Sequence, residues 1–232
     1  MTDITLIMPY YENPRMLEKH YEHLRQLPDE IKERLHLIII DDCSPVAPAL
    51  WSGIDIASYQ MFRVDVDINW NQDACRNIGV KHAPTEWVLL TDIDHMIPVE
   101  TLQALQTKKW QSHLVYSFRR VSAPEMTPFK WHPNTWFMTR SMYEKIGGYD
   151  ERFAGNYGTD SEFQSRLLAV TGTYTQCNLA IIRVPREVVA DASTVGLVRK
   201  NIRDKKRIAA LRKERGNQPP LRFQFPYHQV SP

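Results

Sequence analysis

Three apolar runs in the first half of the chain each pass directly into polar residues, and this feature constrains the fold most. The runs are Ile4–Pro9, Leu35–Asp42 and Glu86–Asp92. Nearly unbroken apolar runs of this length are typical of strands buried on both faces of a parallel sheet. Segments with helical periodicity separate them. The alternation predicts an α/β fold with βαβ units and a mainly parallel sheet, in which Pro9 ends the first strand.

The ends of these strands carry the polar residues that indicate a site. They are Pro9-Tyr10-Tyr11, Asp41-Asp42 and Asp92–His95. In open parallel sheets, ligands bind beyond the carboxyl ends of the strands. We therefore expect the three clusters to converge on one edge of the sheet and to form a binding site there.

Asp92 and Asp94 form a D-x-D pattern at the end of an apolar strand. Carboxylate oxygens suit Mg²⁺ or Mn²⁺, which proteins hold through one or two carboxylates together with phosphate oxygens. A solvated turn or a helix cap would give the same pattern. The apolar strand before it, and the carboxylates at the neighbouring strand ends, favour the metal.

A length of 232 residues allows one large α/β domain or two small ones. No run approaches the roughly 18 to 20 apolar residues of a membrane helix. The N-terminus lacks the pattern of a signal peptide. The cysteines, Cys43, Cys75 and Cys177, are odd in number and widely spaced, so no disulfide framework is indicated. We expect a cytoplasmic protein.

Positive charge is concentrated near the C-terminus. The segment Arg199–Arg215 holds nine Lys and Arg against Asp204 and Glu214, a net charge of +7, whereas the whole chain carries +2. The remaining residues therefore sum to −5. This asymmetry indicates an anionic partner. We divide the chain into a first half that carries the three strand-end clusters (1–120), a second half (121–198) and a basic helix with a Pro-rich tail (199–232).

Three stretches together resemble a known family. "ITLIMPYYEN", "LIIIDDCSP" and "NQDACRNIGVKHAPTEWVLLTDIDH" are similar to the first strand, the second strand, and the Arg-Asn helix with its D-x-D strand of GT-A glycosyltransferases, particularly family 2. The resemblance implies a GT-A (Rossmann-like) domain with a C-terminal extension. It also implies transfer of a sugar, most simply from a UDP-sugar, to an acceptor hydroxyl.

The same resemblance implies roles for individual residues. Asp94 would coordinate Mn²⁺ or Mg²⁺ at the diphosphate, and Asp92 would touch the ribose or the metal. Which of Asp41 and Asp42 bonds the base stays open. The other donor-site residues implied are Pro9 and Tyr11 at the base, and Asp73 and Arg76 along the nucleotide.

The second half has its own resemblance. "WFMTRSMYEKIGGYDERFAGNYGTDSEFQSRL" is similar to the C-terminal segment of galactosyltransferase-like enzymes. It departs from their pattern at Tyr157, where Trp is usual, and at Thr159, where Glu is usual. Asp160 fits the position of the catalytic base, with Glu162 as the second candidate. One carboxylate suffices to deprotonate an acceptor hydroxyl, and a base opposite the leaving group implies inversion.

Histidines provide the candidates for a third metal ligand. Related enzymes often carry a His-Gln pair near the end of the domain, and "FPYHQV" places His228 there. His95, directly after the D-x-D, is the alternative.

The acceptor is left open between a glycan and a hydroxymethylated pyrimidine in DNA. Trp131, His132 and Trp136 are the candidate acceptor residues, because aromatic rings could stack on an extruded base. The basic segment could follow a phosphate backbone, lie on an anionic membrane, or be a solvated helix.

Two other functions compete with glycosyl transfer. A nucleotidyltransferase would carry a Gly-rich loop after the first strand, and "PYYENPR" has no glycine. A non-catalytic nucleic-acid-binding module would use the basic segment, but would leave the carboxylates at the strand ends unexplained.

Overall fold

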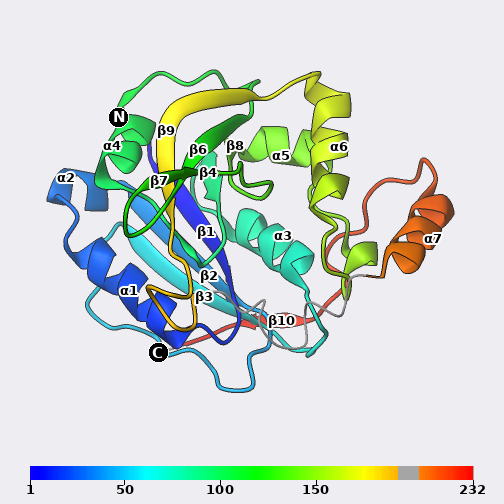
Figure 1. The fold of residues 1–232 in the computed structure, drawn as a ribbon, viewed down its shortest axis with the longest axis horizontal. Helices are drawn as coiled ribbons and strands as arrows, with labels where there is room; N and C mark the ends of the chain where they lie inside the picture. The colour runs from blue at the N-terminus through cyan, green and yellow to red at the C-terminus, as the bar shows by residue number, and fades with distance from the viewer. Residues whose placement is uncertain (193–203, 232) are drawn as a thin grey trace.

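The structure is a computed structural model that describes residues 1–192 and 204–231, drawn in Figure 1. Its strands form one sheet in the order β10-β3-β2-β1-β4-β8-β6-β9-β5, with β7 paired to β6. The strands are β1 (Ile4–Tyr10), β2 (Leu35–Asp41), β3 (Ser58–Val64), β4 (Trp87–Leu90), β5 (His95–Met96), β6 (Tyr116–Ser122), β7 (Thr127–Phe129), β8 (Trp136–Thr139), β9 (Thr175–Arg183) and β10 (Tyr227–Gln229). The helices are α1 (Pro14–Arg25), α2 (Asp29–Lys32), α3 (Gln72–His82), α4 (Val99–Thr107), α5 (Arg140–Ile146), η1 (Glu151–Phe153), α6 (Asp160–Thr171) and α7 (Lys205–Arg215).

The predicted parallel core is present as β3-β2-β1-β4, in which each neighbouring pair is parallel. Pro9 does not end β1, which continues to Tyr10 in register with Asp41 of β2. A proline is tolerated there because β4 pairs with β1 only as far as Ile7. The missing N–H of Pro9 lies on the β4 side of the strand, where no ladder bond is lost.

Helices cover both faces of this sheet (Figure 1). On one face of the sheet, apolar residues of α1, α2 and α4 pack in one cluster with alternate residues of β1. On the other face, apolar residues of α3, α5 and α6 pack in a second cluster that includes Ile7 of β1. Gly79 allows α3 to lie close to β1, because a Cβ there would be 2.3 Å from Ile7 Cγ2. Gly79 is one turn from Arg76, so this close approach sets the height of the Arg76 side chain above the sheet.

The second half of the chain joins the same sheet rather than forming a separate one. β8 pairs with β4 in antiparallel fashion, and β10 from the tail pairs with β3 at the opposite edge. The predicted division at residues 120 and 198 therefore does not correspond to separate sheets.

A buried polar network fixes the turn that leads to the second half of the site. Asn77, on α3, accepts hydrogen bonds from the Tyr143 hydroxyl (2.6 Å) and the Tyr149 N–H (3.0 Å). Its amide donates to the Tyr149 carbonyl and to Glu151 Oε1. Glu151 in turn accepts the N–H groups of Phe223 and Gln224 in the tail. The network ties α3, the Gly-Gly turn and the tail together.

Among the residues described, no helix combines the length and the apolar character needed to span a bilayer.

Candidate active site

Asp92 lies just beyond β4, between a cation and a histidine. Arg76, which is 1% exposed, forms an ion pair with its Oδ1, and His132 Nε2 lies 3.2 Å from its Oδ2. Burial raises the pKa of Asp92, but Arg76 and His132 outweigh it and hold the pKa well below its usual range. Asp92 is therefore an ionised carboxylate with both oxygens engaged.

Asp94 faces a second buried histidine. His95 Nδ1 lies 2.7 Å from Asp94 Oδ1, and the Asp94 side chain is 24% exposed. Burial raises the pKa of Asp94, but His95 outweighs it, so the net pKa lies below the usual value. The rings of His95 and His132 are in contact, with centroids 4.2 Å apart. Each aspartate of the D-x-D thus faces one of two histidine rings that contact each other at an interplanar angle of 40°.

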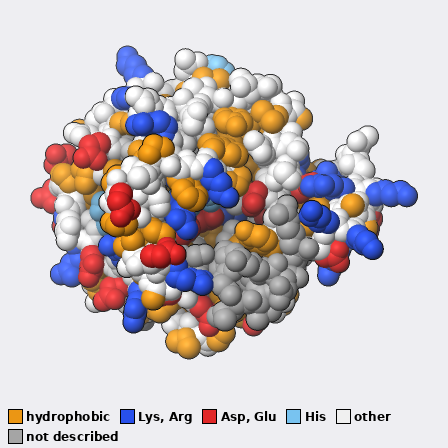
Figure 2. Space-filling view, in the orientation of Figure 1, with side chains coloured by type: hydrophobic (Ala, Val, Ile, Leu, Met, Phe, Trp, Pro, Cys, Tyr) orange, Lys and Arg blue, Asp and Glu red, His pale blue; other side chains and the backbone are white. Residues whose placement is uncertain are grey.

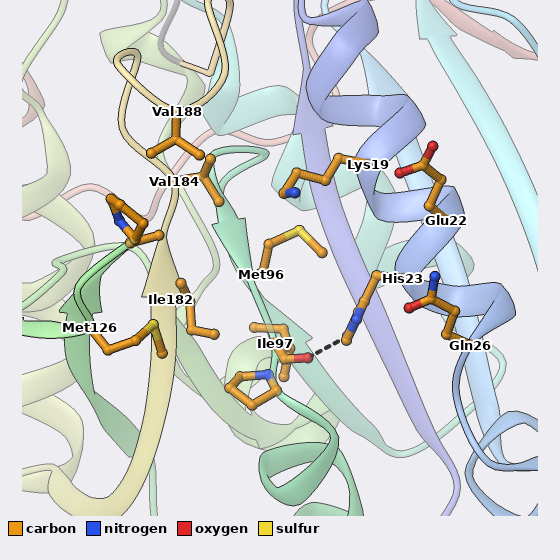
Figure 3. Close-up of a pocket in the computed structure, with 13 residues that line it drawn as sticks. Lys19, Glu22, His23, Gln26, Met96, Ile97, Met126, Ile182, Val184 and Val188 are labelled. Atoms are coloured by element: carbon orange, nitrogen blue, oxygen red, sulfur yellow. Dashed lines mark hydrogen bonds between the residues drawn. The ribbon is translucent and has the colours of Figure 1, made fainter.

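The backbone of this loop is held from the side of α1. His20 Nε2 lies 2.8 Å from the Ile93 carbonyl, and His23 Nε2 lies 2.8 Å from the Ile97 carbonyl, as Figure 3 shows for His23. The Val184 N–H donates to the Asp94 carbonyl at 2.8 Å.

A cavity of about 480 Å³ lies behind the loop and is lined by His23, Ile97 and Val184 among others. None of Asp92, Asp94 and Asp160 borders this cavity.

The buried His20 makes the free energy of unfolding depend on pH. Burial lowers its pKa to about 4, from 6.5 in the unfolded chain. The neutral ring therefore contributes stability that is complete above pH 6.5 and is lost as the pH falls toward 4, by up to about 3 kcal/mol. We expect His20→Gln, which keeps an N–H donor, to reduce the loss. Urea unfolding of both proteins at pH 7 and pH 4.5 checks this, and an equal loss in both would contradict it.

Asp160, at the N-terminus of α6, belongs to the same site. Its Oδ1 accepts a hydrogen bond from the Asn134 amide at 2.6 Å, and Asn134 Oδ1 accepts one from the Tyr149 hydroxyl at 3.4 Å. The Tyr149 ring lies 5.1 Å from the guanidinium carbon of Arg76. Asp160, from one half of the chain, is therefore connected to Asp92, from the other, through Asn134, Tyr149 and Arg76.

Asp73, in the first turn of α3, is close to this network. Burial raises its pKa to about 7, although the charge of Arg76 opposes the shift, and Asp160 adds to it. Asp73 and Asp160 are thus close enough for their charges to interact, as the sequence predicts for residues that line one site.

The two aspartates at the end of β2, Asp41 and Asp42, are already bonded within the protein. Asp41 is fully buried and accepts the Ser44 N–H at 3.0 Å, and its other oxygen pairs with Arg63. Asp42 accepts the Asn71 N–H at 3.0 Å, which joins the end of β2 to the start of α3. Pro9 is buried in β1, whereas Tyr11 is half-buried in the following loop.

Three residues beside the strand ends adopt left-handed backbone conformations that non-glycine residues rarely take. They are Glu12 (φ 46°), Cys43 (φ 53°) and Trp70 (φ 62°). Such residues concentrate at binding sites, where the surrounding structure holds them. Their position, after β1, after β2 and before α3, marks the same edge of the sheet.

Glu162, the second candidate for the base, is bonded to two arginines of α7. Its Oε1 accepts a hydrogen bond from Arg212 Nε at 2.6 Å and its Oε2 accepts one from Arg215 Nη1 at 2.9 Å. Residues two apart on an α-helix point about 200° apart. Because Asp160 faces Asn134, Glu162 must face the opposite side, where it anchors α7.

The structure places His228, the predicted metal ligand, away from the D-x-D. His228 lies on β10, where its Nδ1 is 2.6 Å from Asp65 Oδ1. Four strand spacings separate β10 from β4, which is about 19 Å. His95, the alternative, has its Nε2 occupied by Arg120 at 3.2 Å and its Nδ1 turned to Asp94.

The three predicted acceptor residues lie in different surroundings. Trp136 is fully buried in β8, against Trp131, Phe163 and Tyr174, so it supports the core and cannot stack on an acceptor. Trp131 is half-buried and stacked on Tyr174. His132 faces Asp92 rather than an open surface.

The residues present fit a divalent cation bound mainly through Asp94. Within the described part of the chain, no three His, Cys, Asp or Glu side chains are arranged as a ligand group. Mg²⁺ and similar divalent cations, however, need only one or two protein carboxylates when phosphate oxygens and water complete the coordination shell. Asp94 is ionised and partly exposed, and among the described residues nothing donates to its second oxygen.

A profile of the family described as Glycosyl transferase family 2 matches residues 5–167. The chain belongs to this family. The matched residues include β1 from Thr5 onward, the D-x-D loop and Asp160. The predicted family resemblance is confirmed.

Solved structures show the same fold at low sequence identity. Staphylococcus aureus TarS 1–349 with UDP-GlcNAc superposes with a TM-score of 0.61 at 14% identity, over 83% of this chain and 62% of that one. The catalytic domain of Drosophila β1,4-galactosyltransferase 7 with xylobiose gives 0.52 at 12%, over 76% and 65%. The Pyrobaculum calidifontis mannosyltransferase PcManGT with GDP-Man and Mn²⁺ gives 0.57 at 15%, over 95% and 68%.

These similarities confirm the predicted GT-A fold. The chain spans less than two thirds of the length of the first two of these structures. No curated protein matched the sequence.

Sequence reasoning missed the residues that connect the site. Asn134, Tyr149 and Arg120 are polar side chains in segments dominated by apolar or turn residues. The Gly-Gly-Tyr-Asp turn was the one available signal for Tyr149. Nothing in the local pattern distinguishes Arg120 from its neighbour Arg119.

Proposed function

We propose that this protein is a glycosyltransferase that moves a sugar from a nucleotide diphosphate to an acceptor hydroxyl. One observation carries the proposal. Asp92 and Asp160 come from opposite halves of the chain, yet one polar network joins them through Arg76, Tyr149 and Asn134. Such a site can hold an anionic donor on one side and a base on the other. The ligands of the similar structures, UDP-GlcNAc and GDP-Man, are donors of this class.

Each of these residues would have its own role in the transfer reaction. Asp94 would hold Mn²⁺ or Mg²⁺, which would offset the negative charge that develops on the leaving diphosphate. Arg76 and Asp73 would line the nucleotide, and Asp92 would orient Arg76. Asp160 would accept the proton of the acceptor hydroxyl. A base on the side away from the diphosphate gives inversion at the anomeric carbon.

The donor site can be tested without an acceptor. Calorimetric titration with UDP, in Mn²⁺ and then in excess chelator, should show binding that disappears with the metal. GDP is the second nucleotide to titrate, given the mannosyltransferase complex. Failure of every nucleotide to bind would contradict the proposal and favour a non-catalytic module.

The acceptor that we propose is a glycan or a hydroxymethylated pyrimidine in DNA, and the basic helix α7 bears on the second of these. α7 buries only Ile208 and is anchored by Arg212 and Arg215 on Glu162. Arg212 Nη2 also donates to Ser161 Oγ at 3.3 Å, next to Asp160. Figure 2 shows the Lys and Arg side chains gathered on this helix. Because α7 buries only Ile208, most of its Lys and Arg side chains stay available to contact an anionic partner.

Residues 199–203 of the predicted basic segment lie outside the described part of the chain. On α7 itself, Lys205, Lys206, Arg207 and Lys213 are exposed. Duplex binding that weakens steeply with salt, and that weakens further in K205A/K206A, would support the DNA acceptor. Transfer to a glycan with no binding to DNA at low salt would instead support the glycan.

A further inference from the structure

The contacts around His95 identify its tautomer. Arg120 Nη1 lies 3.2 Å from His95 Nε2, and both side chains are buried. A guanidinium has only donors, so Nε2 must accept. The single ring proton is then on Nδ1, which lies 2.7 Å from Asp94 Oδ1. His95 therefore carries its proton on the nitrogen that faces the aspartate.

Arg120 is itself held in place. Its guanidinium carbon lies 4.6 Å from the ring centroid of Phe129, and that of Arg183 lies 4.8 Å from the same ring. Arg183 is also the residue opposite His95 in the β5–β9 pairing. Phe129 of β7 thus packs against Arg120 and Arg183 together, and Arg120 contacts His95.

We propose that Arg120 and His95 are positioning residues that fix the Asp94 carboxylate in the orientation needed to hold the divalent cation. The inference rests on the proposed function, because it assigns Asp94 the metal. It assigns the two buried side chains a task other than ligation: Arg120 selects the tautomer, and His95 orients one carboxylate oxygen so that the other faces the site. Outer partners of metal-bound carboxylates commonly change metal affinity by about 10- to 100-fold when they are removed.

The first test reads the tautomer directly in the full chain. With ¹⁵N-labelled histidine, ring nitrogen NMR at neutral pH should show His95 protonated on Nδ1 alone. Protonation on Nε2 would overturn the inference. In Arg120→Met the preference for Nδ1 should be lost. Arg119→Met, the exposed neighbour on the same strand, should leave the His95 signal unchanged.

The second test separates positioning from packing. Asn can place an N–H where His has Nδ1, whereas the longer Gln places its amide near the position of Nε2. In the presence of UDP, we expect His95→Asn to bind Mn²⁺ within about threefold of wild type. His95→Gln and Arg120→Met should bind it about 10- to 100-fold more weakly. Circular dichroism and the midpoint of thermal unfolding establish that each variant is folded.

Equal Mn²⁺ affinity in folded His95→Gln and wild type would overturn the inference. So would an equal loss in His95→Asn and His95→Gln, because a role in packing alone does not distinguish the two amides. Wild-type protein with the Nδ1 tautomer but no binding of Mn²⁺ or nucleotide would instead overturn the proposed function, and with it the metal role of Asp94.

Discussion

Asp94→Asn is expected to lower the affinity for Mn²⁺-dependent nucleotide binding by about 100-fold or more and to abolish sugar transfer. The substitution keeps the shape of the side chain but removes the charge that would hold the cation. A cation that stabilises a leaving diphosphate contributes several kcal/mol, which corresponds to about 10²- to 10³-fold in rate. Calorimetric titration with UDP and Mn²⁺, and steady-state rates with a nucleotide sugar, measure the two effects.

Asp65→Asn is the matched control for this experiment. Asp65 also lies beside a histidine, with His228 Nδ1 2.6 Å from its Oδ1, but at the other edge of the sheet. Its substitution should leave metal and nucleotide binding unchanged. Wild-type affinity in Asp94→Asn would remove the D-x-D from the metal site. Weaker metal and nucleotide binding in Asp65→Asn would instead support His228 as a metal ligand.

Asp160→Asn is expected to leave donor binding intact and to reduce kcat by about 10²- to 10⁴-fold, the range typical of a general base. Asparagine still accepts the Asn134 hydrogen bond that Asp160 accepts at 2.6 Å, so the loop geometry should be kept. It cannot take a proton from the acceptor hydroxyl. Titration with UDP and Mn²⁺ tests the first part of the expectation, and single-turnover rates test the second.

Glu162→Gln is the control, two residues further along the same helix. Glu162 anchors Arg212 and Arg215, so its substitution should loosen α7 and affect acceptor binding more than kcat. An active Asp160→Asn together with an inactive but folded Glu162→Gln would move the base to Glu162 and contradict the assignment made from the structure.

The parallel core and the edge that carries the site could be predicted from the sequence. The runs that begin at Ile4, Leu35 and Trp87 carry apolar residues on both faces of the strand. Such strands are stable only when helices cover both faces of the sheet. Once these strands are parallel, topology brings Asp41, Asp92 and their neighbours to one edge. The family resemblance then added Asp160, which no local periodicity identifies as a base.

One part of the structure was predictable but was missed. Asp160 and Glu162 are two positions apart at the start of α6, and the helical repeat places them on opposite sides. Only one of them could face the site. The choice of Asp160 as the first candidate agrees with the geometry, whereas Glu162 as an alternative does not.

Only the tertiary structure decided which polar residues contact one another over long separations. His95 and Arg120 are 25 positions apart, and Asn134 and Asp160 are 26 apart. Their contacts depend on the register of β5, β6, β8 and β9, which local sequence does not specify. His228 and Trp136 show the same limit, because strand order placed the first at the far edge and buried the second. The sequence by itself determined the sheet and the chemistry at its edge, since burial and periodicity are local properties. The partners of each aspartate depend on strand order, and the folded chain alone decides that.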